Sequence, residues 1–441
     1  MIIPVLRNSH PENALDKLAI ERNLIDYDSD KAVPTDGTFD QHLGNHIRVI
    51  EGDIMLTKQQ EEIWNQTSDY MGIFADRSIM TMRNKRQAYH ADNYFWQNGI
   101  VPYRFDSKLS EHAKIIIKKS MDIWERNTCI KFVPASNKKN ALVFMRVRTG
   151  CSSYIGHMSQ WTKQPVSVGY NCEHIHTISH EIGHALGFLH THTRADRDNY
   201  IRIEFNNILR GLSSNFMRTS QRDNYNYGLP YDYGSVMHYG KKAFTSNNGL
   251  TIVPRISWYE DTMGSGTGPT FIDLLMMNTH YKCLDYCKNR IQCLNNGYPH
   301  PRDCNQCMCP SGYGGQYCER RPDSPGCGEN LRATYEWQTL NARMGNYKYN
   351  DDMSYCHWWI EAERDDIIEV KIKSLSGSCS EGCIYGGLEL KANADKRLTG
   401  YRFCCKSRNG KIMQANGPIL PLILFNRRDF TQAQIEYRIR R

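Results

Sequence analysis

Residues 180 to 190 constrain the fold of this 441-residue chain more than any other segment. They read His180-Glu181-Ile182-Gly183-His184-Ala185-Leu186-Gly187-Phe188-Leu189-His190. His180 and His184 lie one turn apart on a helix, so their rings can reach a common point. His190 reaches it only if the helix ends first, because six more helical residues would carry it roughly 9 Å along the axis. Gly187 can adopt the left-handed conformation that ends a helix and turns the chain back.

Three histidines brought together in this way predict a zinc site. Imidazole nitrogens are common zinc ligands, and three protein ligands leave a fourth position open for catalysis. Glu181 lies beside them, where its carboxylate can take a proton from a water that the metal activates. We expect one zinc ion per chain, held by His180, His184 and His190, with Glu181 as the base. The first two histidines alone could be an ordinary exposed helix face, but Gly187 and the third histidine favour the metal.

The sixteen cysteines indicate the compartment. None precedes Cys129, and thirteen lie between Cys283 and Cys405. An even number in clusters predicts disulfides, which persist in oxidising surroundings, so we expect a secreted, extracellular protein. No signal peptide is visible, because charged residues follow the short apolar run at 1–6, and we attribute this to a lost or misassigned start. No apolar run is long enough to span a bilayer, so we expect no membrane anchor.

The first segment, residues 1–86, is polar, free of cysteine and poor in strand pattern. It carries an N-glycosylation sequon at Asn65 and ends in the basic run 83–86. We expect a processing protease to cut between Arg86 and Gln87, although an exposed charged turn would have the same composition. The formal net charge of the chain is +8 and its basic residues are scattered, so we expect no nucleic-acid binding.

Residues 87–283 have the pattern of one α+β domain. Strands are expected at 100–105 and 141–147, an amphipathic helix at 111–127, and the histidine-bearing helix at 177–187. The stretch 199–268 is rich in Tyr, Asn and Gly and looks short of regular elements.

The last third of the chain divides in two. Six cysteines between 287 and 318 mark a module too small for a hydrophobic core, which disulfides must hold together. Beyond residue 327, short alternating segments such as 357–362, 367–372 and 388–392 are separated by turn residues, which predicts a β-sandwich.

Beyond His190 the chain resembles the astacins, a branch of the metzincin metalloproteases. The resemblance rests on Arg194-Ala195-Asp196-Arg197-Asp198-Asn199-Tyr200 and on Ser235-Val236-Met237-His238-Tyr239, which is similar to the Met-turn of the family. It implies a two-lobed α+β protease domain with an active-site helix. It also implies that Met237 forms an apolar floor beneath the metal. Tyr239 would be a further ligand that can leave the metal and donate a hydrogen bond in the transition state.

The N-terminal segment resembles an astacin propeptide at Glu51-Gly52-Asp53-Ile54. The resemblance implies that Asp53 holds the fourth position on the zinc in a zymogen, although a Gly-Asp pair alone usually marks only a turn. One position departs from the family pattern. Thr191 stands where astacins typically have a glutamate that reaches toward the new N-terminus.

The cysteines after the protease domain resemble two further modules. The six from Cys287 to Cys318, with glycines before the last, look like an EGF-like module at 284–320, and the segment Cys356–Ala362 resembles a CUB domain at 327–438. The resemblance implies these disulfides: Cys129–Cys283, Cys151–Cys172, Cys287–Cys304, Cys293–Cys307, Cys309–Cys318 and Cys327–Cys356. The pairing among Cys379, Cys383, Cys404 and Cys405 stays open.

Together these features predict a secreted zinc endopeptidase, made as a zymogen, that hydrolyses extracellular or matrix proteins after a processing protease activates it. A zinc-stabilised scaffold without activity is the rival hypothesis, and the intact Glu181 argues against it. We expect residues 152–154 to form the edge strand that binds substrate. Residues 264–281 contain no Lys or Arg, so that segment predicts no basic pocket. Whether the C-terminal modules dock substrate or only stabilise the chain stays open.

Overall fold

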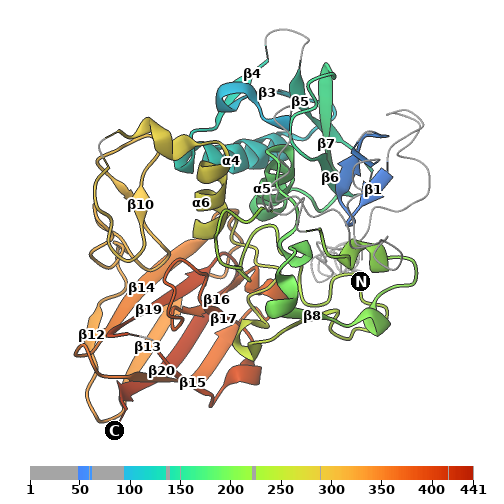
Figure 1. Cartoon of the computed structure of the whole chain (residues 1–441). Coiled ribbons are helices and arrows are strands. Elements are labelled where there is room, and N and C mark those ends of the chain that lie inside the picture. Colours follow the sequence, from blue (N-terminus) through green and yellow to red (C-terminus); the bar gives the residue numbers. More distant parts are fainter. Residues whose placement is uncertain are drawn as a thin grey trace, which may run out of the picture.

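The computed structural model describes residues 48–58, 60–61, 94–135, 140–148, 150–220, 225–288, 290–415 and 417–440. Asn65, Arg86 and Gln87 lie outside this range, so the sequon and the cleavage site remain predictions. The described chain forms a histidine-bearing domain (94–283), a small disulfide-rich module (287–318) and a β-sandwich (327–440), as Figure 1 shows. We call these three parts the histidine domain, the cysteine module and the sandwich. The predicted fold class is confirmed.

The histidine domain is built on a twisted sheet that β1 and β2 of the N-terminal segment extend to seven strands, in the order β1-β2-β6-β7-β5-β3-β4. The four neighbouring strands β4, β3, β5 and β7 are parallel, with β4 at one edge of the sheet, and β6 is antiparallel to β7. The strands are β1 (Arg48–Ile50), β2 (Ile54–Leu56), β3 (Ile100–Phe105), β4 (Lys131–Pro134), β5 (Ala141–Arg146), β6 (Cys151–Tyr154) and β7 (Lys163–Val168). The expected strand at 100–105 is confirmed at both ends, and the one expected at 141–147 ends one residue earlier.

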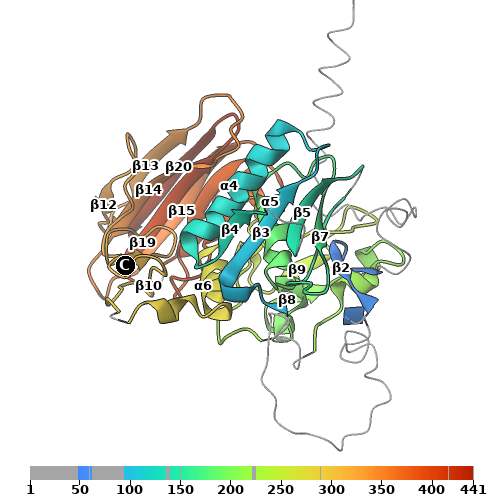
Figure 2. The same cartoon turned by 90° about the horizontal axis from the view of Figure 1, so that it is seen from above.

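Helices α4 (Glu111–Asn127) and α5 (Ile175–Ala185) pack against each other beside this sheet, as the view from above shows (Figure 2). Helix α4 has the predicted bounds, and α5 begins and ends two residues before the predicted 177–187. Trp124 joins the two helices, because its ring is fully buried and its Nε1 donates a hydrogen bond to the carbonyl of Ser179 at 3.1 Å. Helix α5 is thereby anchored to the core. Its C-terminal end reaches the predicted metal site.

The loop-rich part of the histidine domain, residues 199–268, has two short strands, β8 (Ile201–Ile203) and β9 (Ile252–Pro254). The expectation of few regular elements is confirmed for the described part of this stretch. Stacked rings hold it together: Tyr200 lies on Tyr231 at 4.7 Å and Tyr233 on Tyr259 at 4.1 Å between centroids. Helix α6 (Phe271–His280) follows and begins with a capping box between Thr270 and Asp273.

Strands β1 and β2 correct the expectation that the N-terminal segment is poor in strands. Strand β2 pairs in parallel with β6, with Ile54 opposite Ser153 and Met55 opposite Tyr154. Ile54 and Leu56 are buried against Ile155 and Leu189. A strand of three residues is too short to show alternation, and its conformation is imposed by the sheet edge that it pairs with.

The cysteine module has one short ladder, β10 (Tyr298–Pro299) with β11 (Cys307–Met308). Its core is small and includes Trp359 of the sandwich, whose Nε1 donates to the carbonyl of Gly312 at 2.7 Å. The module is therefore packed onto the sandwich.

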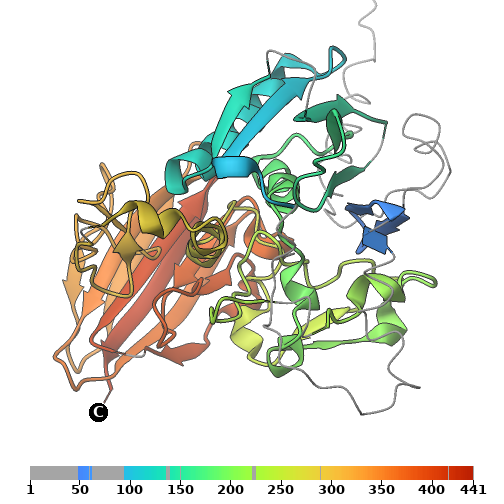
Figure 3. The ribbon, with the colours of Figure 1, turned by 45° about the horizontal axis from the view of Figure 1, so that its top comes forward.

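The sandwich packs a five-stranded sheet, order β12-β14-β19-β16-β17, on a four-stranded one, order β13-β20-β15-β18. Its strands are β12 (Asn330–Arg332), β13 (Gln338–Met344), β14 (Ser354–Glu361), β15 (Ile368–Gly377), β16 (Gly386–Leu390), β17 (Tyr401–Phe403), β18 (Ile412–Gln414), β19 (Ile419–Asn426) and β20 (Thr431–Ile439). The three expected segments coincide with β14, β15 and β16 within a few residues, except that β15 runs on to Gly377. Figure 3 shows the sandwich beside both the cysteine module and the loop-rich part of the histidine domain.

Eight disulfides use all sixteen cysteines. Six are the pairs that the resemblance implied. The structure also assigns the four cysteines left open, joining Cys379 to Cys405 and Cys383 to Cys404. Among the described residues, no helix combines the length and apolar character that crossing a membrane requires.

Candidate metal centre

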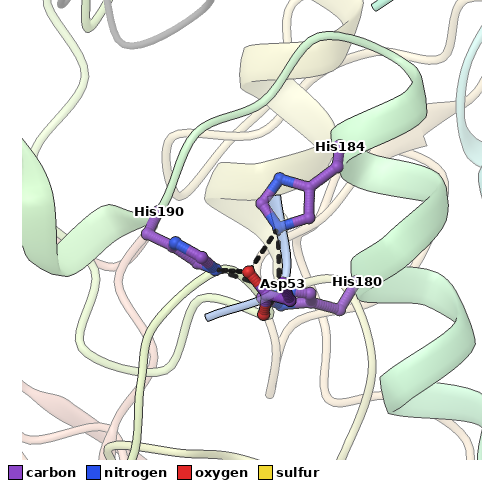
Figure 4. A group of neighbouring side chains, drawn as sticks. All are labelled: Asp53, His180, His184 and His190. Carbon is purple, nitrogen blue, oxygen red and sulfur yellow. Dashed lines mark hydrogen bonds and ion pairs between the residues drawn. The ribbon is translucent and has the colours of Figure 1, made fainter. Parts of the chain in front are cut away.

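Helix α5 carries two of the three histidines and ends before the third. His180 and His184 lie on its last turns, and the chain leaves the helix after Ala185. Gly187 has φ +112°, a conformation that side chains rarely adopt, and Phe188 N donates back to the carbonyl of Gly183 at 3.0 Å. This turn brings His190 opposite the other two rings, as Figure 4 shows. The geometry is the one that the spacing of the segment requires.

Hydrogen bonds at Nδ1 fix the orientation of each ring. His180 Nδ1 lies 2.7 Å from the carbonyl oxygen of Val236, and His184 Nδ1 lies 2.7 Å from that of Phe188. His190 Nδ1 lies 2.7 Å from Oε2 of Glu51. A carbonyl or carboxylate oxygen only accepts, so each Nδ1 carries the proton and each Nε2 is left with its lone pair. Such outer contacts orient metal-binding histidines.

The three Nε2 atoms converge on one point. His180 Nε2 lies 3.0 Å from His184 Nε2 and 3.1 Å from His190 Nε2. Zinc–nitrogen bonds of about 2.0–2.1 Å in tetrahedral geometry place ligand atoms roughly 3.3 Å apart, close to these values. Three lone pairs facing one another repel unless a cation lies between them. The donor set therefore fits zinc.

Asp53 completes the set from the turn between β1 and β2. Its Oδ1 lies 3.2 Å from His190 Nε2 and 3.6 Å from His184 Nε2, and its Oδ2 lies 3.3 Å from His180 Nε2. One ligand atom from each of the four residues lies within 4.8 Å of the others. Burial alone would raise the pKa of Asp53, but the histidines, with His190 foremost, lower it well below its usual range. A carboxylate so placed can serve as a fourth zinc ligand.

Glu51 is a contact of the site that the sequence analysis missed. Its side chain is 2% exposed, and its Oε2 accepts the hydrogen bond from His190 Nδ1. Its backbone carbonyl accepts a hydrogen bond from the hydroxyl of Tyr239. Burial raises the pKa of Glu51, which the contact with His190 partly offsets. Only its place two residues before Asp53 could have suggested this role.

Glu181 lies where a base is required. Its side chain is 1% exposed and lines a pocket together with Asp53, His180 and Tyr239. Among the described residues, its Oε2 has no hydrogen-bond partner. Burial, and then the negative charge of Asp53, raise the pKa of Glu181 well above its usual range. A buried carboxylate with such an oxygen beside a metal is suited to proton transfer.

Met237 and Thr191 hold the elements around the three histidines in place through packing and hydrogen bonds. Met237 is fully buried, and its sulfur lies so close to α5 that a Cβ added at Gly183 would be 2.8 Å from it. Thr191 N donates to the carbonyl of Met237 at 2.8 Å, and the Thr191 hydroxyl donates to Ser235 Oγ at 2.9 Å. Ser235 in turn donates to Oδ1 of Asp273 at 2.6 Å. Thr191, the departure from the family pattern, thus ties the turn of His190 to the Met-turn.

Tyr239 packs against the site, with its ring 4.5 Å from that of His190 between centroids. Its ring stacks on His192 at 3.9 Å between centroids, and its hydroxyl bonds to Glu51. Metal ligation by Tyr239 therefore stays a prediction for the chain without its N-terminal segment.

Comparison with known proteins identifies the family. The family model for astacin, a family of peptidases, matches residues 88–282. The zinc metalloproteinase nas-31 of Caenorhabditis elegans is 38% identical over 397 residues, which cover 88% of this chain and 63% of that protein. The chain thus spans less than two thirds of the length of nas-31. Nas-29 of the same organism is 35% identical over 403 residues, covering 88% of this chain and 75% of that one.

Among solved structures, the high choriolytic enzyme 1 of Oryzias latipes, a hatching enzyme zinc-protease, is 31% identical. The match covers 45% of this chain and 99% of that one, with a TM-score of 0.41. The relatives and the family model agree with the three converging histidines. The chain belongs to the astacin family of zinc metalloproteases.

Proposed function

We propose that this chain is a secreted zinc endopeptidase, made as a zymogen, that hydrolyses peptide bonds of extracellular or matrix proteins. The observation that carries the proposal is the buried Glu181, which has an oxygen without a partner among the described residues and lies beside three converging histidine nitrogens. An inactive zinc-stabilised scaffold has no use for such a base.

The positions of the residues in the site indicate which group would perform each part of the reaction. A zinc ion held by His180, His184 and His190 would supply Lewis-acid chemistry, lowering the pKa of a water toward neutrality and polarising the carbonyl of the peptide bond. Glu181 accepts the proton of the attacking water and delivers it to the leaving amine. The Nδ1 contacts of His180, His184 and His190 with carbonyl and carboxylate oxygens leave the Nε2 atoms free to hold such an ion.

The edge of the sheet supports the proposed mode of substrate binding. Strand β6 carries β2 on its outer side, and Ser153 N donates to the carbonyl of Asp53 at 3.0 Å. An extended substrate can take the same place once the N-terminal segment has left, adding a strand to the sheet. Tyr239 would then be released from Glu51 and become available to the reacting carbonyl or the metal.

Latency is proposed from the position of Asp53. Residues 1–86 form the propeptide in this proposal, 87–283 the catalytic domain, 284–320 the EGF-like module and 327–438 the CUB domain. A processing protease cutting between Arg86 and Gln87 separates Asp53 from the catalytic domain. The disulfides, from Cys129–Cys283 to Cys383–Cys404, support folding in the secretory pathway.

The test is hydrolysis of denatured casein or gelatin by the processed protein. We expect activity that a zinc chelator abolishes, and a loss of about 10²- to 10⁴-fold in kcat for Glu181→Gln, with one zinc per chain retained. Glu173→Gln is the matched control, because Glu173 lies just before α5 and pairs with Arg146 at 2.7 Å. Equal rates for the processed wild type and Glu181→Gln, both loaded with zinc, would refute the enzymatic function.

A further inference from the structure

We propose that the sandwich forms part of the substrate pocket, because its Arg402 and Arg427 position the loop 264–267 that lines this pocket. The inference rests on the proposed function. It assigns to the C-terminal sandwich a role in the selectivity of the catalytic domain, in place of a docking or a passive role.

The loop 264–267 is a wall of the pocket that holds the candidate base. Gly264 and Ser265 line this pocket together with Glu181 and Tyr239. Gly264 has φ +76° and packs so closely on Gly240 that a Cβ would be 2.7 Å from its Cα. The loop belongs to no helix or strand, so its position depends on what holds it from outside.

Arg402, on β17 of the sandwich, holds the side chains of the loop. Its Nη1 donates to the hydroxyl of Ser265 and to Oγ1 of Thr267, the latter at 3.0 Å. Its backbone N donates to Thr262 Oγ1, also at 3.0 Å. Arg402 is 6% exposed, so these bonds form away from water. Buried bonds from a charged donor are strong and directional.

Glu389, on β16, fixes Arg402 from the sandwich side. Its Oε2 accepts from Arg402 Nε at 2.8 Å, and its Oε1 accepts from Gly400 N at 2.8 Å. Ser311 of the cysteine module also donates to Oε1, at 3.3 Å. Glu389 is 2% exposed. The buried carboxylate of Glu389 thus contacts the cysteine module directly through Ser311 and the histidine domain through Arg402.

Arg427, after β19, holds the backbone of the same loop. Its Nη2 donates to the carbonyl of Gly266 at 2.7 Å, and the residue is 4% exposed. Ile384 packs on Gly266 so closely that a Cβ there would be 2.7 Å from the Ile384 Cβ. Gly382 lies against the carbonyl of Gly264, where no side chain fits. The loop is therefore held over its whole length by the sandwich.

The charges of Arg402 and Glu389 explain why this contact fixes the position of the loop more than it stabilises the fold. A buried arginine–glutamate pair adds little to stability because both ions lose their hydration, yet it tolerates only one geometry. The segment 264–281, to which the loop belongs, supplies no Lys or Arg. The two guanidinium groups that reach the loop come instead from the last fifty residues of the chain. Arg402 and Arg427 are positioning residues in this proposal, because they act through the loop and touch no reacting atom.

The test compares processed full-length variants in kcat, KM and side-chain preference at each position of a mixed peptide library. For Arg402→Ala and Arg427→Ala we expect kcat/KM to fall about 10- to 100-fold, mainly through KM. The preference at one peptide position should broaden while the other positions keep theirs, with zinc content unchanged. Arg438→Ala is the matched control, because Arg438 pairs with Glu369 inside the sandwich at 2.9 Å. It should resemble the wild type.

Two further variants distinguish a change in side-chain preference from a folding defect. Thr267→Val removes one acceptor of Arg402 and leaves the Arg402–Glu389 pair intact, so it should shift the same peptide position more weakly. Arg402→Lys keeps the charge and should restore part of the preference. Unchanged preference at every position in Arg402→Ala, Arg427→Ala and Thr267→Val, with zinc bound and the wild type active, would overturn the inference. An inactive wild type would instead refute the proposed function.

Discussion

The N-terminal segment around β2 and the sandwich both border the pocket beside the histidines, and they do so in different ways. The N-terminal segment reaches it with Asp53, which lies in the turn before β2, a strand of three residues that pairs with β6 near one end of the sheet. The sandwich reaches it through buried side chains, with Arg402 paired to Glu389 and Arg427 on the carbonyl of Gly266.

The difference teaches how a permanent contact is distinguished from a removable one. Strand β2 is bound mainly through backbone groups and a small apolar cluster, and an extended substrate can offer the same backbone groups to β6. The sandwich contact needs particular charged partners on one side and particular acceptors on the other. In the proposed zymogen, the segment that leaves uses backbone contacts that an extended substrate can replace.

Asp53→Ala should have the largest effect, because it breaks the removable contact at its ligand. The uncleaved variant loses a tethered carboxylate, and we expect its peptidase activity to exceed that of the uncleaved wild type by about 10²- to 10⁴-fold. The measurement is the initial rate on a quenched fluorescent peptide before any processing. Glu61→Ala, an acidic residue of the same segment, is the control. An uncleaved Asp53→Ala chain as silent as the wild type would show that latency has another cause.

Glu389→Ala should break the permanent contact. It leaves the buried guanidinium of Arg402 without its counter-ion, and removal of one partner of a buried pair costs about 3–5 kcal/mol. We expect a lower melting temperature in calorimetry, with unfolding of the sandwich and the histidine domain no longer coincident. Glu436→Ala, on an exposed face of the sandwich where it pairs with Lys371 and Lys373, should melt as the wild type does. Identical melting of the two variants would contradict a structural role for Glu389.

Asp232→Asn tests the interface between the histidine domain and the sandwich through the pH dependence of stability. Asp232 accepts hydrogen bonds from Thr399 N and Oγ1 of the sandwich at 3.1 and 3.0 Å. Burial raises the pKa of Asp232 to about 6. The folded chain therefore keeps a proton that the unfolded chain loses near pH 4, and stability falls as pH rises from about 4 through 6, by at most about 3 kcal/mol.

The asparagine variant lacks this titration. Relative to the wild type, its melting temperature should rise across the same pH window and stay level below pH 4. Parallel melting curves from pH 4 to 7 would show that Asp232 titrates normally.

Asp352→Ala should have the smallest effect, although it too breaks a contact between the sandwich and the histidine domain. Asp352 pairs with Lys119 of α4 at 2.6 Å, but its side chain is 71% exposed. Exposed pairs contribute about 0–1 kcal/mol, so we expect a change in the free energy of unfolding below about 0.5 kcal/mol. Denaturant titration in low and high salt measures it. A loss as large as that of Glu389→Ala would remove the distinction between buried and exposed contacts.

The sequence predicts the parts of this molecule that local pattern determines. Helix α4 and strand β3 have the bounds that their periodicity indicates, and the turn at Gly187 follows from the spacing of His184 and His190. The identity of the metal and the nature of the histidine domain follow from the same eleven-residue segment.

Contacts between distant segments could not be predicted in this way. Strand β2 exists because it pairs with β6, and Glu51 matters because His190 lies opposite it across 139 positions of the chain. The pairing of Cys379 with Cys405 rather than Cys404 depends on how the sandwich folds. Arg402 and Arg427 carry no local signal, since a buried arginine in a strand or turn looks like any other in the sequence.

The short, parallel pairing of β2 has a consequence for activation. Cutting the proposed link after Arg86 changes neither Asp53 nor the edge that it occupies. The cut changes the effective concentration of the segment: while tethered it faces its site at roughly millimolar concentration, and once released it faces the site only at its bulk concentration. Strand β2 pairs with β6 through two residues, Ile54 and Met55, so in the proposed zymogen this dilution favours loss of the cut segment. If the proposed cleavage activates the chain, release of the cut segment is the activating step, and we expect the cut protein to stay inactive wherever that segment remains concentrated enough to rebind.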